Sequence, residues 1–129
     1  MLVADILNLP FIYVRPKPKE HGLGNMIEGE IESIKNVVVI EDLISTGKSS
    51  LQAVEALRNA NIKVLGMVAI FTYGFEHAEI NFKNMNVNLI TLSNYHVLIE
   101  TALETGYIKE SDLETLKKWR INPENWKQE

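Results

Sequence analysis

Apolar residues follow two alternating patterns along the chain. Short apolar runs, several of them rich in β-branched residues, predict strands at residues 10–14, 37–42, 62–71 and 87–92. Apolar residues that recur every three or four positions predict helices at residues 1–8, 48–59 and 76–84, followed by two helices toward the C-terminus. Strands that alternate with helices predict an α/β fold, with a mainly parallel sheet flanked by helices and right-handed crossovers.

Local signals mark the ends of the predicted helices. Ser93 is predicted to cap one C-terminal helix and Gly106 to end it, and residues 111–114 fit a capping box for the last helix. The two tryptophans are predicted packing anchors, Trp119 and Trp126. The helix after the second strand carries one apolar stripe for packing on a sheet, formed by Leu51, Val54 and Leu57.

The strand predicted at residues 37–42 leads into the most informative segment of the chain. Its four consecutive β-branched residues are the pattern of a strand buried on both faces. Two carboxylates, Glu41 and Asp42, come at its end, and a turn of small residues, Ser45-Thr46-Gly47, then opens a helix. In open parallel sheets, ligands bind just beyond the carboxyl ends of the strands, so we expect this segment to carry the chemistry.

This turn suits a phosphate group. Gly47 lets the backbone approach a ligand closely, and the first N–H groups of the helix lack partners within the helix and favour an anion. Hydroxyl donors are added by Ser45, Thr46 and Ser49. The acid pair can accept hydrogen bonds from sugar hydroxyls or help to hold a hydrated Mg²⁺ ion. A ribose 5-phosphate would satisfy both parts of the segment.

Two other interpretations of the segment stay open at this point. One is a solvated strand end followed by an ordinary serine cap. The other is a P-loop, because Gly47-Lys48-Ser49 matches the end of that motif. The first glycine of a P-loop would fall on Asp42, whose charge would repel a phosphate. We therefore favour the sugar-phosphate site.

A second segment brings four potentially cationic side chains close together in the sequence. Prolines and glycines interrupt regular structure around them. Such a segment suits closure over a polyanion such as diphosphate, and an ordinary solvated basic loop is the alternative. The four residues are Arg15, Lys17, Lys19 and His21.

These segments resemble a known family. Residues 37–49 resemble the phosphoribosyl-diphosphate (PRPP) binding motif of type I phosphoribosyltransferases, and residues 15–22 resemble the mobile catalytic loop of orotate phosphoribosyltransferases. The resemblance implies ribose contacts for Glu41 and Asp42. It implies PRPP contacts along the rest of the motif, at Leu43, Ile44, Ser45, Thr46, Gly47, Lys48 and Ser49.

The basic loop receives its roles from the same resemblance. Arg15, Lys19 and His21 match the residues that contact diphosphate, and either Lys19 or His21 is expected to protonate a diphosphate oxygen. Pro16 departs from the family pattern, since many relatives have a lysine there, and Lys17 is a candidate substitute one position later.

The remaining roles concern catalysis and the base. The implied catalytic residues are Lys19, His21 and Asp42, and the implied orotate contacts are Ser45 and Tyr73. Tyr73 stands where some relatives carry an orotate-contacting arginine. The implied reaction transfers ribose 5-phosphate from PRPP to orotate, giving orotidine 5′-monophosphate and diphosphate in pyrimidine biosynthesis. Mg²⁺ is expected to bind through PRPP, with water-mediated contacts to Glu41 and Asp42 and no direct protein ligand.

The resemblance also implies a homodimer in which the mobile loop is shared between subunits. Relatives carry a further N-terminal region, so we expect a truncated chain that binds PRPP weakly and turns over slowly or not at all. Two alternatives remain: a purine or uracil phosphoribosyltransferase, and a non-catalytic PRPP-binding regulatory module.

Length and composition limit the remaining possibilities. The 129 residues suggest one domain, and 46% hydrophobic residues are enough to form a core. A net charge of −4 argues against a nucleic-acid partner. The chain has no cysteine, which excludes disulfides and fits a cytoplasmic location. No apolar run is long enough to span a membrane.

Overall fold

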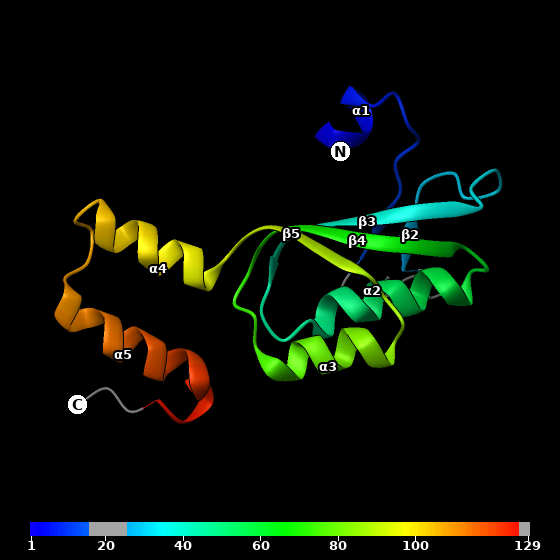
Figure 1. Ribbon diagram of the computed structural model, residues 1–129. Helices are drawn as coiled ribbons and strands as arrows, with labels where there is room; N and C mark the ends of the chain where they lie inside the picture. Colours follow the sequence, from blue (N-terminus) through cyan, green and yellow to red (C-terminus); the bar gives the residue numbers. More distant parts are fainter. Residues whose placement is uncertain (16–25, 127–129) are drawn as a thin grey trace.

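A computed structural model describes residues 1–15 and 26–126 of the chain (Figure 1). Its elements alternate between strands and helices through the middle of the chain, and two helices follow at the C-terminal side. In order, the elements are α1 (Leu2–Ile6), β1 (Tyr13–Val14), β2 (Ile27–Glu28), β3 (Asn36–Ile44), α2 (Lys48–Asn59), β4 (Lys63–Thr72), α3 (Glu76–Asn84), β5 (Leu89–Asn94), α4 (Tyr95–Glu104), α5 (Glu110–Ile121) and the short 3₁₀ helix η1 (Pro123–Asn125).

The sheet that organises the molecule is parallel, as predicted, and its strand order β3-β4-β5 follows the chain. Ile40 of β3 pairs with Val68 of β4, which pairs with Ile90 of β5. A register shift near the start of β3 leaves Leu65 as an extra residue of β4. Helix bounds predicted at residues 48–59 and 76–84 are confirmed, whereas β3 extends two residues beyond the predicted strand end.

Helices α2 and α3 cover one face of this sheet (Figure 1). The predicted stripe of α2 lies in the core, where Leu51, Val54 and Leu57 are all at most 5% exposed. The same core contains buried side chains from the strands and from α3, among them Ile44, Met67 and Phe82. Burial of these apolar side chains is the main force that holds the two layers together.

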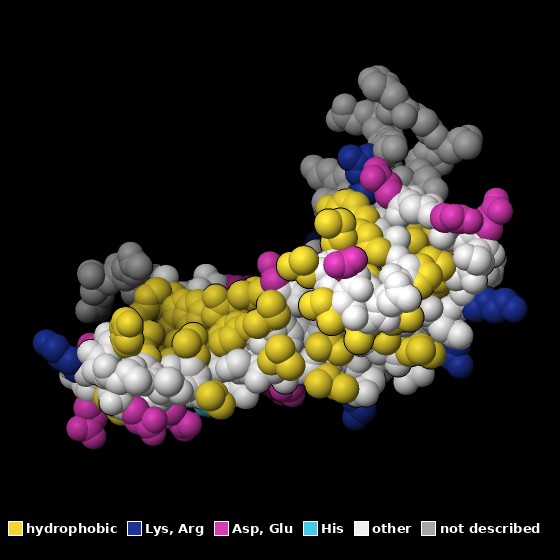
Figure 2. Space-filling model, turned by 90° about the horizontal axis from the view of Figure 1, so that it is seen from above, with side chains coloured by type: hydrophobic (Ala, Val, Ile, Leu, Met, Phe, Trp, Pro, Cys, Tyr) yellow, Lys and Arg dark blue, Asp and Glu magenta, His cyan; other side chains and the backbone are white. Residues whose placement is uncertain are grey.

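The opposite face of the sheet is open to solvent, so the predicted burial of β3 on both faces is wrong. Alternation along the strands directs one set of apolar side chains away from α2 and α3. Helices α2 and α3 lie on the other side of the sheet, and α1, which Figure 1 draws above it, has no buried residue. Figure 2, seen from the side of α1, shows many hydrophobic side chains at the surface of the molecule. We call this set the outer sheet face; its members, each between 49% and 75% exposed, are Val38, Ile40, Ile70, Ile90 and Leu92.

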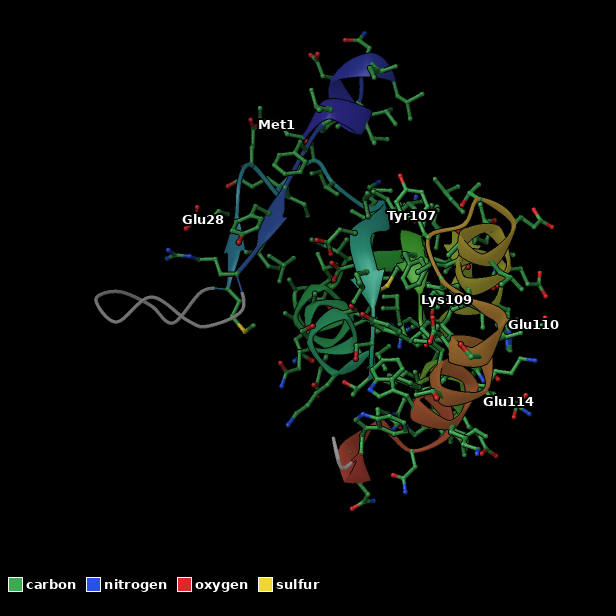
Figure 3. All side chains as sticks on the ribbon, turned by 90° about the vertical axis from the view of Figure 1, so that its left-hand side faces the viewer. Met1, Glu28, Tyr107, Lys109, Glu110 and Glu114 are labelled. Atoms are coloured by element: carbon green, nitrogen blue, oxygen red, sulfur yellow. The ribbon has the colours of Figure 1, made fainter. Side chains whose placement is uncertain are left out.

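A small antiparallel ribbon lies beside the main sheet. It pairs β1 with β2, and β1 covers only the last two residues of the strand predicted at residues 10–14. Ile27 of this ribbon packs with Leu57 and Ile62 in a second buried cluster, which attaches the ribbon to the C-terminal end of α2. Figures 1 and 3 both place the ribbon, marked by Glu28 in Figure 3, apart from the α4–α5 pair.

Helices α4 and α5 form a hairpin at the other side of the sheet (Figure 1). The predicted end of α4 is confirmed: Gly106 has a φ of 76°, and its N–H donates to the Leu103 carbonyl while the Tyr107 N–H donates to the Ala102 carbonyl. The predicted cap at Ser93 is wrong, because β5 runs through that residue and the Asn94 side chain accepts the capping bond instead.

The start of α5 also differs from the prediction. The helix begins at Glu110, so Ser111 lies inside its first turn rather than before it. The Asp112 carboxylate accepts a hydrogen bond from the Lys109 N–H at 2.9 Å, and this contact replaces the predicted capping box. Within the described residues, no helix is long and apolar enough to cross a membrane.

Candidate functional site

The acid pair lies inside β3 rather than beyond its end. Glu41 pairs with Ala69 of β4 and is half-buried, whereas Asp42 is exposed. One oxygen of the Asp42 carboxylate accepts a hydrogen bond from the Leu43 N–H at 2.7 Å. Because successive residues of a strand point to opposite faces, the two carboxylates start on different sides of the sheet. A ligand that touches both must approach β3 from the edge that does not pair with β4.

The 45–49 loop, which includes the first two residues of α2, follows at the carboxyl end of β3. Ser45 is half-buried, and Thr46, Lys48 and Ser49 are exposed, so their side chains are open to a ligand. The Thr46 hydroxyl accepts a long hydrogen bond, 3.4 Å, from the Lys48 N–H. Gly47 occupies the N-cap position of α2 and has no side chain with which to cap the helix. The first N–H groups of α2 therefore face the loop, as an anion site requires.

Gly47 is fixed by two separate constraints. Its φ of 75° lies in the left-handed region, which residues with a Cβ adopt at a cost. A Cβ built on Gly47 would lie 2.6 Å from Cε2 of Phe82, a core residue of α3. The close approach of the loop to α3 therefore depends on glycine, and it holds the start of α2 against the second helix.

Backbone bonds connect the end of β3 to the turn between β4 and α3, residues 73–75. The carbonyl of Ile44 accepts hydrogen bonds from the Tyr73 N–H at 3.1 Å and from the Thr72 hydroxyl at 3.4 Å. The Gly74 N–H in turn donates to the Thr72 hydroxyl oxygen at 3.0 Å. The Ile44 side chain is fully buried, which leaves only its backbone near a ligand. The 73–75 turn and the 45–49 loop thus form one connected edge.

The predicted base contact, Tyr73, lies in an aromatic cluster. Its ring is stacked on Phe75 at 5.4 Å between centroids and also contacts Phe71, Tyr95 and Trp119. Tyr73 is half-buried, so part of the side chain still reaches the surface. The packing role predicted for Trp119 is confirmed, and Trp126 is 37% exposed outside this cluster.

Tyr95 anchors this cluster to α5. Its hydroxyl donates to the carbonyl of Leu116 at 3.1 Å. Burial raises the pKa of Tyr95 from its ordinary value of 10.0, and the neighbouring Tyr73 raises it further, while Arg120 lowers it. The hydroxyl therefore stays protonated as a hydrogen-bond donor under ordinary conditions.

Arg120 is a residue of this edge that sequence reasoning missed. From α5, its Nε donates to the carbonyl of Tyr73 at 2.9 Å and its Nη2 donates to the carbonyl of Gly74 at 2.6 Å. The two partners are 46 and 47 residues away in the sequence, so no local pattern could have revealed the contact.

The described part of the basic loop consists of Arg15. Its Nε lies 3.3 Å from a carboxylate oxygen of Glu28, and its backbone N–H donates to the carbonyl of Met26 at 2.7 Å. Arg15 is therefore held on the β1–β2 ribbon. The other predicted diphosphate residues, Lys17, Lys19 and His21, lie outside the described residues, as does Pro16.

Two hollows of similar size adjoin the core layer. One, of about 440 Å³, lies between α2 and α3 and takes Thr46 and Lys48 of the 45–49 loop among its lining residues. The other, of about 460 Å³, lies beneath β5 and is lined by Ile44 and Gly74 among others. Neither is lined by Glu41 or Asp42, so the acid pair lies outside both hollows.

The acid pair suits a metal ion that binds mainly through a substrate. The described residues contain no group of three or more histidine or carboxylate side chains able to hold a metal ion. Mg²⁺ keeps several waters and often uses only one or two carboxylates together with substrate phosphates. Glu41 and Asp42 are two carboxylates of the kind that this binding mode uses.

Comparison with known proteins identifies close relatives. No protein-family model matches the chain. The chain is 57% identical over 126 residues to the orotate phosphoribosyltransferase of Cytophaga hutchinsonii, which covers 98% of this chain and 60% of that protein. It is 59% identical over 125 residues to the orotate phosphoribosyltransferase of Bacteroides thetaiotaomicron, covering 97% of this chain and 59% of that one. The chain thus spans about 60% of the length of these curated relatives.

Solved structures with a similar fold agree with this result. UMP synthase of Leishmania donovani matches with a TM-score of 0.74 over 92% of this chain and 25% of that one, at 24% identity. Orotate phosphoribosyltransferase of Aeropyrum pernix matches with a TM-score of 0.63 over 83% of this chain and 56% of that one, at 27% identity. The type I phosphoribosyltransferase fold and the resemblance predicted from the sequence are both confirmed.

Proposed function

We propose that the chain is the PRPP-binding part of an orotate phosphoribosyltransferase, the enzyme that transfers ribose 5-phosphate from PRPP to orotate and releases diphosphate. The observation that carries this proposal is the identity of 57–59% to such enzymes over nearly the whole chain. The geometry of the 45–49 loop supports it, because a helix start without a side-chain cap follows the acid pair, with only residues 43–47 between them.

The 45–49 loop binds the 5-phosphate in this proposal. The N–H groups of the first turn of α2 and the exposed hydroxyls of Thr46 and Ser49 donate to the phosphate oxygens. Lys48 is exposed beside them and adds a positive charge. Leu43 and Ile44 contribute backbone groups only, since Ile44 is buried in the core. The ligand reaches Glu41 and Asp42 from the open edge of β3, where their carboxylates accept hydrogen bonds from the ribose hydroxyls.

Catalysis rests on charge stabilisation at the sugar and at the departing diphosphate. Glu41 and Asp42 stabilise the positive character that the sugar carbon gains as diphosphate leaves. Glu41 and Asp42 would hold a PRPP-bound Mg²⁺ ion through its waters, and the ion would supply positive charge against the departing diphosphate. Arg15, Lys19 and His21 contact diphosphate from the neighbouring subunit of a homodimer, and Lys19 or His21 protonates it. Lys19 and His21 lie outside the described residues.

The base is expected at the junction of the 45–49 loop and the 73–75 turn. Ser45 and Tyr73 lie on these two segments, which the Ile44 carbonyl connects. Tyr73 offers an uncharged ring and a hydroxyl rather than a cation, so its contact with orotate is a packing or hydrogen-bonding one. We expect the reaction to take place in the cytoplasm.

The experiment that tests the proposal measures PRPP binding to the purified chain by isothermal titration calorimetry with Mg²⁺ present. Binding that is lost in Asp42→Asn and Gly47→Ala, but kept in the exposed control variant Lys63→Met on β4, supports the proposed site. Absence of binding to PRPP in the folded wild-type chain contradicts it.

A second measurement distinguishes an enzyme from a PRPP-binding module. The chain is mixed with PRPP, Mg²⁺ and one base, and orotate absorbance and diphosphate release are followed. Release that depends on orotate, and not on uracil or adenine, supports the proposed reaction. PRPP binding without any base-dependent release would show that this chain by itself binds PRPP without transferring its ribose 5-phosphate.

A further inference from the structure

We propose that Arg120 is a positioning residue for the 45–49 loop, acting through the 73–75 turn. The inference rests on the proposed function, because that function assigns the loop its phosphate ligand. Arg120 itself lies on α5, outside every segment that the sequence associates with PRPP.

The first step is the bond between the turn and the strand that precedes the loop. Ile44 is the last residue of β3, and Ser45 begins the 45–49 loop directly after it. The Ile44 carbonyl accepts from both the Tyr73 N–H and the Thr72 hydroxyl. Any displacement of the 73–75 turn is therefore transmitted to the peptide that leads into the loop.

The second step is the pair of hydrogen bonds that Arg120 makes to the same turn. One guanidinium group donates to two consecutive carbonyls, those of Tyr73 and Gly74, in the fork geometry that this planar group provides. Gly74 has a φ of 65°, and a Cβ built there would lie 3.2 Å from Nη2 of Arg120. A side chain at position 74 would therefore crowd the guanidinium.

The third step is the packing that fixes α5, the helix that carries Arg120. The neighbouring Trp119 packs its ring against Tyr73, Phe75 and Tyr95 at centroid distances of 5.6, 6.1 and 5.5 Å. The Tyr95 hydroxyl bond to the Leu116 carbonyl fixes the preceding turn of α5. Because α5 is anchored in this way, Arg120 can hold the turn in one position instead of following its movements.

The arrangement explains how α5 can influence a site that it does not line. Loss of the guanidinium frees two carbonyls of the 73–75 turn and weakens the hold on the Ile44 carbonyl. The N–H groups of the 45–49 loop then sample more orientations. Phosphate binding must restrict them again, and this loss of conformational entropy weakens the affinity. Arg120 is expected to affect affinity for the phosphate without touching the ligand.

The test uses three variants of the full chain. Arg120→Met keeps most of the side-chain length and removes all donors, and Arg120→Lys keeps the charge and one donor direction. Lys118→Met is the matched control, because Lys118 is an exposed cation two residues away on the same helix. The affinity for ribose 5-phosphate and the amide hydrogen exchange rates are measured for each.

Arg120→Met should weaken ribose 5-phosphate binding by about tenfold, which corresponds to about 1.4 kcal/mol. Exchange of the Tyr73 N–H, which donates to the Ile44 carbonyl, should accelerate by about tenfold, while exchange of the Val54 N–H in α2 stays unchanged. Arg120→Lys should give intermediate values, and Lys118→Met wild-type values.

Three results would overturn the proposal. One is wild-type affinity and wild-type exchange in Arg120→Met. Another is equal acceleration of exchange at Tyr73 and Val54, which would mean a general loss of stability. A third is the same loss of affinity in Lys118→Met, which would mean a simple charge effect.

Failure of the proposed function has a separate signature. A wild-type chain that does not bind ribose 5-phosphate at all contradicts the phosphate assignment, and the exchange rates then decide the role of Arg120 alone. If Arg120→Met does not fold, the comparison of Arg120→Lys with wild type decides it, because the lysine variant keeps the charge.

Discussion

Replacement of Gly47 by alanine tests the central geometry of the site. Two penalties add in this variant. An L-residue held in the left-handed region costs about 1–2 kcal/mol. Overpacking of a filled core costs about 1–3 kcal/mol, and the new Cβ would lie 2.6 Å from the buried Phe82 ring. We therefore expect Gly47→Ala to lower the free energy of unfolding by about 2–5 kcal/mol.

Gly106 provides the matched control for the backbone part of this penalty. Its φ of 76° is nearly that of Gly47, at 75°, but a Cβ built on Gly106 would meet no atom within 4 Å. Gly106→Ala should therefore cost only about 1–2 kcal/mol. The difference between the two variants isolates the contact with Phe82.

Urea denaturation followed by circular dichroism measures both variants. At a slope of about 2 kcal/mol per M, a loss of 3 kcal/mol lowers the urea midpoint by roughly 1.5 M. Phe82→Leu supplies the second half of a double-mutant cycle, and in that background Gly47→Ala should cost only the backbone part, about 1–2 kcal/mol. Equal losses in Gly47→Ala and Gly106→Ala, or a Gly47→Ala effect below about 0.5 kcal/mol, would refute the reasoning.

Three further predictions address other parts of the fold. Arg58→Met should cost about 1 kcal/mol in urea denaturation, because exposed Arg58 donates to two backbone carbonyls at the end of α3, and Arg58→Lys should recover part of the loss. Tyr95 has a folded pKa above its unfolded value of 10.0, so its contribution to stability is present below that pH and is lost as pH rises through the folded pKa. Melting temperatures from about pH 8 to about pH 11 should therefore fall more steeply for wild type than for Tyr95→Phe, and parallel curves would contradict this assignment. Ile90→Lys on the outer sheet face should change stability in urea denaturation by less than about 0.5 kcal/mol, because Ile90 is 55% exposed, whereas a large loss would mean that the face is packed.

Helix α2 was predictable from the sequence with its bounds, because its signals are local. Leu51, Val54 and Leu57 repeat at helical spacing, and the turn at Gly47 marks the start. Gly106 likewise ends α4 as predicted, since a left-handed residue after the last helical turn favours glycine. The N-cap of α4 was predicted one residue too early, at Ser93, because β5 continues through that residue and the cap is Asn94.

Burial on the two faces of the sheet could not be predicted from the strands alone. The run at residues 37–40 is apolar at every position, yet only alternate side chains pack against α2. The sequence of a strand shows which of its positions are apolar, but it does not show which other element packs on each face. The contacts of Arg120 were missed for a related reason, since they join residues far apart in the chain and leave no periodic trace.

The agreement between chain order and strand order has a consequence for biosynthesis. From β3 to β5, each strand lies beside the one made immediately before it, with a single helix between them. A nascent polypeptide can therefore add β4 and then β5 as they leave the ribosome, without waiting for distant segments. Assembly of this unit can therefore proceed in one direction, and the edge that accepts the next strand is always that of the strand made last.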